Sequence, residues 1–192
     1  NRNMADMIMI GDVGPGKSFK DGNDIYTSLS IDHNKTAMRG MIVKIKAKNL
    51  RTGSIMERSY NGDTKVEQIF LDKRTMNLMY DDGALVHFQD AETFDEVSIP
   101  KERLEWEMNF ISYENPITVT FYESELLGVE LPAKVTLLIT ETDDNAVAGD
   151  TVNKATMDAV LETGYKLRVP MFVKSNTKIV VRTEDGAYDS RA

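Results

Sequence analysis

Short runs of strand-forming residues, separated by glycine turns, are the feature that most limits how this chain can fold. Asp or Asn precedes Gly at residues 21–22, 61–62, 82–83 and 185–186. Such dipeptides are typical of tight hairpins, because glycine adopts positive φ at little cost. Alternating or β-branched runs lie at residues 41–48, 117–122, 134–140, 165–173 and 178–183. The pattern predicts an all-β fold of barrels or sandwiches rather than alternating strands and helices.

One segment favours a helix instead. It follows Pro100, a residue suited to the first helical position, and it places Leu104, Met108 and Ile111 at positions i, i+4 and i+7. We therefore expect a helix over residues 101–111.

Residues 11–18 match a phosphate-binding loop, with Gly11, Gly16, Lys17 and Ser18 at the required spacing. That loop needs a helix that starts at its Lys-Ser, so that backbone N–H groups face the phosphates. Here an Asp-Gly turn follows four residues after Lys17. We interpret the segment as a turn leading into a first strand, and a nucleotide hydrolase as the least favoured function.

The composition provides few groups for catalysis. The chain has no cysteine and two histidines, His33 and His87, which lie in different segments, and neither has a serine partner in a recognisable motif. We expect no catalytic residue, metal or cofactor, and we therefore expect that the protein is not an enzyme. The absence of cysteine suits a reducing cytoplasm, and the apolar run at residues 7–10 is too short for a signal peptide or a membrane span.

Positive charge is concentrated in one part of an acidic chain. The net charge is −8, yet residues 33–58 contain seven Lys and Arg against one Glu. Lys44, Lys46 and Lys48 alternate with apolar residues, so a strand would place them on one face, about 6.6 Å apart. This stripe suits a phosphate backbone. The alternative is a solvated face whose lysines discourage edge-to-edge aggregation.

The preceding segment, residues 32–41, lacks apolar periodicity and lies between two strand-like runs. We expect it to be the loop of a hairpin. An exposed loop that carries Lys35, Met38 and Arg39 could be a probe inserted into a partner.

Several blocks of the sequence resemble the bacterial elongation factor P family. They are NLRTGSIMERSYNGDTKVE (49–67), LDKRTMNLMYDDG (71–83), VHFQDAETFDEV (86–97), LLGVELP (126–132), GDT (149–151), LETGYKLRVPMFV (161–173) and YDSRA (188–192). The similarity runs in order over almost the whole chain.

The resemblance implies three small barrels: an SH3-like (KOW-type) domain at 4–66, then OB-fold domains at 67–130 and 131–192. It implies a monomeric cytoplasmic factor that binds ribosomal RNA and proteins, and also peptidyl-tRNA, but no nucleotide and no membrane. Its first hairpin would reach the acceptor end of the peptidyl-tRNA and relieve stalling at consecutive prolines.

The resemblance also implies site residues. The hairpin tip would comprise Lys35, Thr36, Ala37, Met38, Arg39 and Gly40. RNA contacts would come from Lys44, Lys46, Lys48, Arg51, Gly149, Asp150, Thr151, Tyr188, Ser190 and Arg191.

The tip departs from the usual Pro-Gly-Lys-Gly of the family. Ungapped alignment places the lysine position on Met38, with Arg39 beside it, which makes Arg39 the candidate for any modification. TAMRG (36–40) is similar to the Thr-Ala-Arg-Gly tip of the elongation factor P-like paralogues, with Met38 inserted.

The C-terminal third departs at two further places. Residues 157–159 read Met-Asp-Ala where Lys-Pro-Ala is usual, and Asn176 stands where glycine is usual. Asparagine enters the left-handed region readily, so the second change is tolerable.

Two alternative functions stay open at this point. One is the paralogue, with an overlapping role in stall relief. The other is a general OB-fold protein that binds single-stranded RNA, although aromatic residues make up only 8% of the chain and do not cluster as base-stacking surfaces require.

Overall fold

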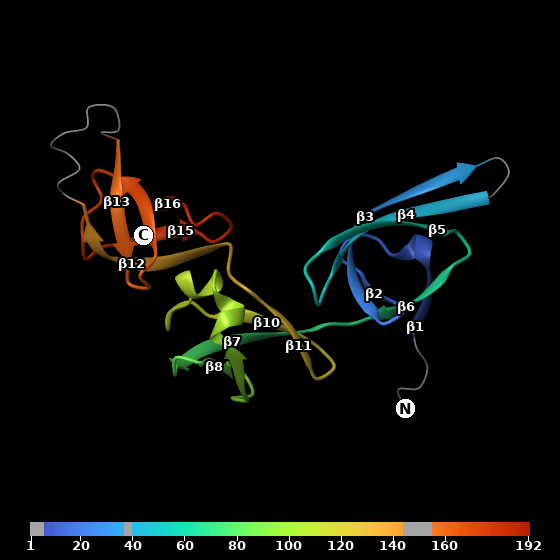
Figure 1. Ribbon diagram of the computed structural model, residues 1–192, viewed down its shortest axis with the longest axis horizontal. Helices are drawn as coiled ribbons and strands as arrows, with labels where there is room; N and C mark the ends of the chain where they lie inside the picture. Colours follow the sequence, from blue (N-terminus) through green and yellow to red (C-terminus); the bar gives the residue numbers. More distant parts are fainter. Residues whose placement is uncertain (1–5, 37–39, 144–154) are drawn as a thin grey trace. The chain divides into compact units, whose positions relative to one another are not determined.

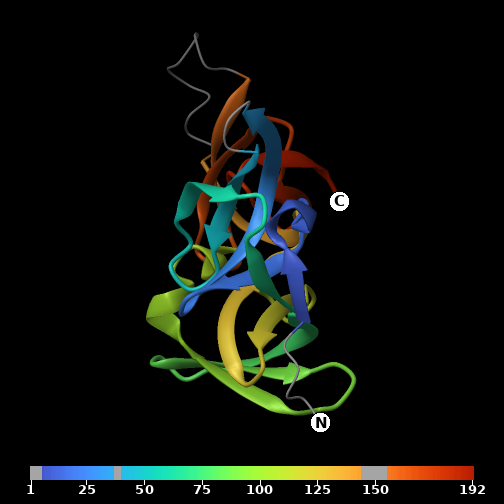
Figure 2. The same ribbon diagram turned by 90° about the vertical axis from the view of Figure 1, so that its right-hand side faces the viewer.

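The computed structural model describes residues 6–36, 40–143 and 155–192, and its regular elements are β-strands and short 3-10 helices. The first sheet has the order β1-β6-β2-β3-β4-β5 and comprises β1 (Asp6–Met9), β2 (Ser18–Asp21), β3 (Asp24–Thr36), β4 (Gly40–Asn49), β5 (Ile55–Asn61) and β6 (Lys65–Ile69). A 3-10 helix, η1 (Ile10–Asp12), follows β1. Figures 1 and 2 show this sheet curling on itself, while β3 and β4 continue beyond it as a two-stranded ribbon.

Two further sheets follow. The second has the order β11-β10-β7-β8-β9, with β7 (Asp72–Asp81), β8 (Leu85–Asp90), β9 (Glu96–Pro100), β10 (Ile117–Tyr122) and β11 (Glu125–Glu130). The third has the order β14-β13-β12-β15-β16, with β12 (Lys134–Thr142), β13 (Thr156–Leu161), β14 (Lys166–Pro170), β15 (Lys178–Arg182) and β16 (Tyr188–Arg191). The prediction of an all-β fold is confirmed.

The chain forms two compact units, one of residues 1–73 with 120–128 and one of residues 74–119 with 129–192. The predicted domain boundary between residues 66 and 67 lies within β6, and the boundary between 130 and 131 lies at the end of β11. The domain bounds stay a prediction.

The core of the first sheet follows from strand alternation. Val43, Ile45 and Ala47 are fully buried, and the lysines between them are exposed. Phe19 and Tyr26 pack in the same cluster, with ring centroids 5.6 Å apart. A period of two therefore directs the apolar half of β4 inward, as the sequence predicts.

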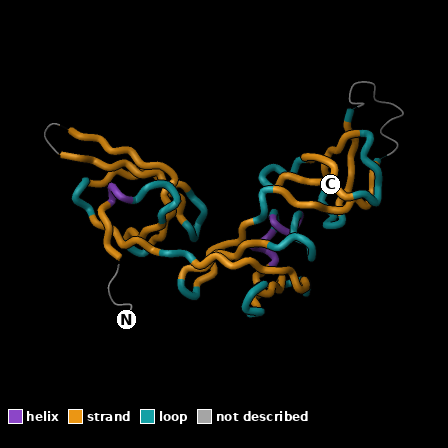
Figure 3. The backbone as a smooth tube through the Cα atoms, turned by 180° about the vertical axis from the view of Figure 1, so that it is seen from behind, coloured by secondary structure: helices purple, strands orange, loops and turns teal. Residues whose placement is uncertain are grey.

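The predicted helix over residues 101–111 is wrong. The segment forms two short 3-10 helices, η2 (Lys101–Leu104) and η3 (Glu107–Asn109), shown in purple in Figure 3. The chain has to bury Leu104 and Ile111 and also to place Phe110 in the core cluster of the C-terminal sheet. Two tight turns with a break at residues 105–106 meet this demand.

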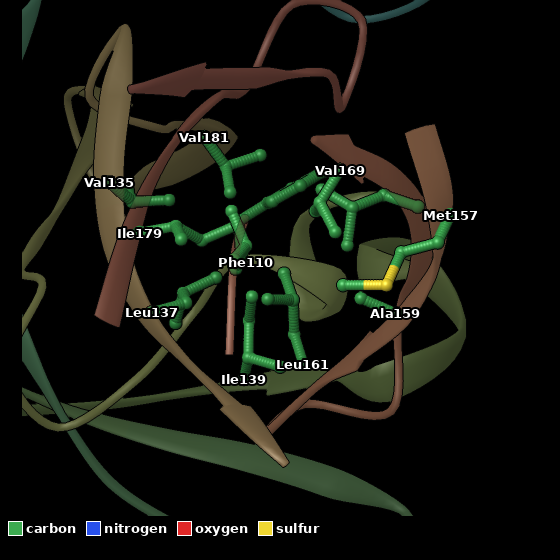
Figure 4. Packing of buried hydrophobic residues seen from close by; sticks show 12 residues of the cluster. Phe110, Val135, Leu137, Ile139, Met157, Ala159, Leu161, Val169, Ile179 and Val181 are labelled. Carbon is green, nitrogen blue, oxygen red and sulfur yellow. The ribbon is translucent and has the colours of Figure 1, made fainter. Parts of the chain in front are cut away.

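Phe110 completes the core of the C-terminal sheet. Its side chain is fully buried in a cluster formed otherwise by residues of β12 to β15 and Val173, as Figure 4 shows. Trp106 and Tyr165 pack edge-on against the Phe110 ring, with centroids 5.0 and 5.1 Å away. The Trp106 indole N–H also donates to the Thr183 carbonyl at 3.1 Å. One aromatic residue upstream of the sheet therefore serves as part of its interior.

Three of the four predicted hairpin turns are confirmed. Gly22, Gly83 and Gly186 have φ of 64°, 97° and 73° and lie between paired or adjoining strands β2–β3, β7–β8 and β15–β16. The Asn61-Gly62 turn is different, because the strands it joins, β5 and β6, are not neighbours in the sheet. The Gly62 φ is not positive either. A corner, not a hairpin, occurs there.

The glycine–lysine motif of residues 11–18 forms a turn, as interpreted from the sequence. Gly16 has φ of 90°, the Lys17 N–H donates to the Gly14 carbonyl at 3.1 Å, and Ser18 begins β2. A strand therefore stands where a phosphate loop needs a helix. This strand is the second rather than the first, because β1 precedes it and pairs with β6.

Candidate nucleic-acid interface

The β3–β4 hairpin is longer than the sequence suggests. The predicted loop at 32–41 is wrong in extent, since the ladder continues from Asp32 opposite Lys44 to Thr36 opposite Gly40. Residues of weak strand propensity are held there by the pairing itself, in which the oppositely charged Asp32 and Lys44 are register partners. The result is a paired β3–β4 arm rather than a broad loop, with β5 beside β4 as far as Ile42.

Three of the six predicted tip residues lie at the end of the described part of this arm. Lys35 is exposed near the end of β3, opposite Met41, and Thr36 is its last residue. Gly40 begins β4 with φ of 71°. Ala37, Met38 and Arg39 lie outside the described residues.

The predicted lysine stripe has the expected geometry. Lys44, Lys46 and Lys48 are exposed and share the outer face of β4, which we call the lysine face. Two acidic residues lie beside it: the Lys44 ammonium is 3.5 Å from the Glu57 carboxylate, and Asp32 is the cross-strand partner of Lys44. The Lys44–Glu57 pair is exposed and worth little in water, so a polyanion could displace it at small cost.

Arg51 is held within the first compact unit. Its guanidinium donates to both Glu125 oxygens, at 2.8 and 3.0 Å, and also to the Asn23 carbonyl. These hydrogen bonds lower the pKa of the Glu125 carboxyl and raise that of Arg51. Arg51, predicted to bind RNA, has a structural partner in this state.

The C-terminal site residues lie on β16, the edge strand next to β15. Tyr188 is partly buried against the C-terminal core, and the Ser190 hydroxyl donates to Asp189. Arg191 stacks its guanidinium over the Phe172 ring, 4.1 Å from the centroid. Gly149, Asp150 and Thr151 lie outside the described residues.

Sequence reasoning missed Phe172. Its ring is 53% exposed and lines a hollow of about 700 Å³ together with Lys174, Lys178 and Arg191. An exposed aromatic between basic side chains is a common means of contacting nucleic acid. The sequence did contain a signal for this site, because Phe172 lies two residues before Lys174 in a turn.

His87 has partners that the sequence did not reveal. Its Nε2–H donates to the Asp82 carboxylate at 2.8 Å, and in the neutral ring Nδ1 accepts from the Ser98 hydroxyl at 2.8 Å. The sequence offered no serine motif for either histidine, and the Ser98 contact arises from strand pairing rather than from such a motif. Tyr80 stacks on the imidazole at 4.2 Å, and the other Asp82 oxygen accepts the backbone N–H groups of residues 84 and 85. The group braces the β7–β8 turn.

Metal-binding clusters and membrane-crossing helices are both missing from the described residues. No group of three or more His, Asp or Glu side chains there is arranged to hold a metal ion. No helix within the same ranges is long and apolar enough to cross a bilayer.

Three family models match the chain in order. They are the elongation factor P KOW-like domain over residues 10–66, the elongation factor P OB domain over 71–129, and the elongation factor P C-terminal domain over 135–191. Together with the three curved sheets, they define a translation elongation factor built from a KOW-like, SH3-type barrel and OB-type barrels.

Curated relatives give the family. Elongation factor P of Mycoplasma pneumoniae is 43% identical over 189 residues, 98% of each chain. That of Mycoplasmopsis agalactiae is 41% identical over 186 residues, covering 97% of this chain and 99% of the relative. The chain belongs to the elongation factor P family, whose members are translation factors and not in general enzymes.

Two solved structures share the fold at low identity. Eukaryotic translation initiation factor 5A from Methanococcus jannaschii matches with a TM-score of 0.51 at 13% identity, covering 67% of this chain and 94% of that one. An initiation factor 5A family protein from Naegleria fowleri gives a TM-score of 0.52 at 11% identity, covering 66% and 99%.

Proposed function

We propose that this protein binds the ribosome beside the peptidyl-tRNA and promotes peptide-bond formation at consecutive prolines. The observation that carries the proposal is the β3–β4 arm, a paired ribbon that extends beyond its sheet and has the lysine face at its base. It acts as a monomer in the cytoplasm, and its partners are ribosomal RNA and proteins and the tRNA acceptor end.

The proposed mechanism is positioning. The ribosome supplies the catalytic centre, and the arm holds the peptidyl-tRNA end in an attack geometry that proline disfavours. Orientation of reactants can offset several kcal/mol of a barrier. Each 1.4 kcal/mol or so is worth about tenfold in rate, so a modest contact at the arm's end is sufficient to relieve a stall.

Arg39 is the residue we place at the reacting end. Its guanidinium stays charged, stacks on bases and donates to phosphate in a fixed fork, which suits contact with tRNA. It is also where we place any modification of the tip. The alternative is that Lys35 or Met38 makes the contact and that Arg39 is a solvated loop residue.

The test is translation of a triproline reporter with Lys35, Met38 and Arg39 changed to alanine in turn, beside a reporter without prolines. Arg39→Ala should lose most stall relief and keep its ribosome affinity, because the missing contact acts only at the reacting centre. Arg39→Lys should recover part of it, since a point charge replaces a planar fork incompletely. Full relief by Arg39→Ala would move the assignment to whichever neighbour fails.

The lysine face is tested separately. Lys44→Glu with Lys46→Glu should weaken ribosome binding without unfolding, because both side chains are exposed. The slope of log affinity against log salt should become shallower by roughly 1.5, as two phosphate contacts are lost. Lys65→Glu with Lys166→Glu, exposed on β6 and β14, is the control with the same charge change. If the Lys44→Glu, Lys46→Glu variant bound ribosomes as tightly as the parent protein, the proposed RNA contact of the lysine face would be refuted.

A general single-strand RNA-binding protein is the competing function. Co-sedimentation with ribosomes against binding to a free single-stranded oligonucleotide separates the two. An affinity for the oligonucleotide equal to the affinity for ribosomes would favour the general RNA-binding function.

A further inference from the structure

The arm is supported unevenly by the rest of its sheet. On the β3 side, β2 pairs only as far as Thr27, so β3 has no strand beyond it on that edge from there to Thr36 among the described residues. On the β4 side, β5 pairs from Lys48 to Ile42. Two-stranded ribbons twist readily and are marginally stable alone. Among the described residues only the pairs beyond Ile42, Lys35 with Met41 and Thr36 with Gly40, lack a third strand, so contacts from outside the ladder have to set the direction of this end.

Gly62 makes a close contact with β4 just beyond the last strand pair. Its N–H donates to the Met41 carbonyl at 2.8 Å. A Cβ at position 62 would lie 2.9 Å from the Met41 carbonyl oxygen and 3.0 Å from the Met41 Cβ. Because these are atoms fixed to the backbone of β4, they could move only if the strand moved. This contact explains a glycine at a corner that needs no positive φ.

His33 makes a matching contact from β3. Its Nε2–H donates to the Gly11 carbonyl at 2.8 Å, which ties the strand to η1. A Cβ on Gly11 would lie 3.3 Å from the same nitrogen and 3.8 Å from Val43 Cγ2. Val43 is the register partner of His33 and Met41 that of Lys35, so this contact lies two residue pairs from the Met41 contact.

We propose that Gly62 and the His33–Gly11 pair are positioning residues that fix the direction of the arm. One contact acts on each strand, and each lies one residue pair from Ile42, where pairing with β5 ends. The inference rests on the proposed function, because direction matters only if the end of the arm acts on the tRNA. A misplacement of about 1 Å at a reacting centre can cost on the order of a hundredfold in rate.

The first measurement is geometric and independent of translation. The chain has no cysteine, so spin labels can be attached through Asn34→Cys on the arm and Ile55→Cys on the far end of β5, both exposed. Gly62→Ala should shift or broaden the distance distribution between the two labels. Gly14→Ala is the matched control, because nothing lies within 4 Å of a Cβ there and its φ is not positive. His33→Ala should broaden the distribution, and His33→Gln, which keeps a side-chain N–H, should restore it.

The second measurement is the triproline reporter, titrated with each variant. Gly62→Ala should lower the maximal relief by about tenfold or more, while the concentration giving half-maximal relief changes by less than about threefold. A variant that was merely less stable would also show reduced stall relief, but a higher concentration of the protein would restore it. Rescue by His33→Gln but not by His33→Ala would support the positioning role.

The outcomes separate this inference from the proposed function. Unchanged label distances in both Gly62→Ala and His33→Ala would overturn the inference. It would also be overturned if the distances changed while stall relief stayed complete, provided that alanine at the tip abolishes relief in the parent protein. If Gly62→Ala does not fold, His33→Ala decides the matter by the same two criteria. If instead no alanine variant at the tip affects relief, the proposed function fails, and the positioning role falls with it even where the distances change.

Discussion

Replacing Phe110 with alanine should cost this protein more stability than most single substitutions. The Phe110 side chain is completely buried among residues of the C-terminal sheet, and two further aromatic rings pack on it. Phe→Ala in a filled core costs about 3–5 kcal/mol, because the transfer free energy is lost and a cavity remains. At a slope of about 2 kcal/mol per M urea, the unfolding midpoint should fall by about 1.5–2.5 M.

The protein contains its own probe for this experiment. Trp106 is the only tryptophan, and its ring contacts both Phe110 and Tyr165. Urea unfolding followed by tryptophan fluorescence therefore reports on this contact directly. Tyr113→Ala is the control, an aromatic truncation in the same segment at a side chain that is 70% exposed. A midpoint for Phe110→Ala within about 0.5 M of the parent would show that Phe110 does not support the C-terminal core.

Two smaller predictions concern the acidic turn and the glycine–lysine turn. The His87 imidazole, with two backbone N–H groups, lowers the pKa of Asp82 to about 2, so the contribution of the Asp82 carboxylate to stability is present above about pH 4 and is lost as pH falls towards 2. Asp82→Asn should flatten the dependence of the unfolding midpoint on pH in that window, and an unchanged curve would contradict this. The exposed Lys17 ammonium donates to the Asp12 carbonyl, so Lys17→Ala should change the free energy of unfolding by less than about 0.5 kcal/mol. Micromolar ATP binding that disappears in this variant would contradict the interpretation of the segment as a turn.

Local patterns predicted the parts of the structure that depend on local physics. Alternation placed Val43, Ile45 and Ala47 in the core and the lysines outside, because a strand has a fixed period of two. Asn176 adopts φ of 63°, the left-handed conformation expected where the family has glycine.

Features that depend on distant partners were not predictable in the same way. The spacing of Leu104, Met108 and Ile111 suits a helix, but Phe110 has to reach the C-terminal sheet, and nothing within residues 101–111 signals that demand. The Asn61-Gly62 dipeptide signalled a hairpin, whereas its glycine serves a close approach to Met41, some twenty residues earlier. Ser98 likewise reaches His87 only because β8 and β9 pair in one register.

The burial of Phe110 in a sheet that begins at Lys134 also bears on how the chain is made. Synthesis proceeds from the N-terminus, so this residue is made before any strand of the C-terminal sheet. The later strands therefore condense around an aromatic side chain that is already attached to the finished part of the chain. A fragment starting at residue 131 would lack it and would leave its hydrophobic cluster open, whereas one starting at residue 101 would carry it. The hydrophobic cluster of the C-terminal sheet thus includes a residue that lies 24 positions before its first strand.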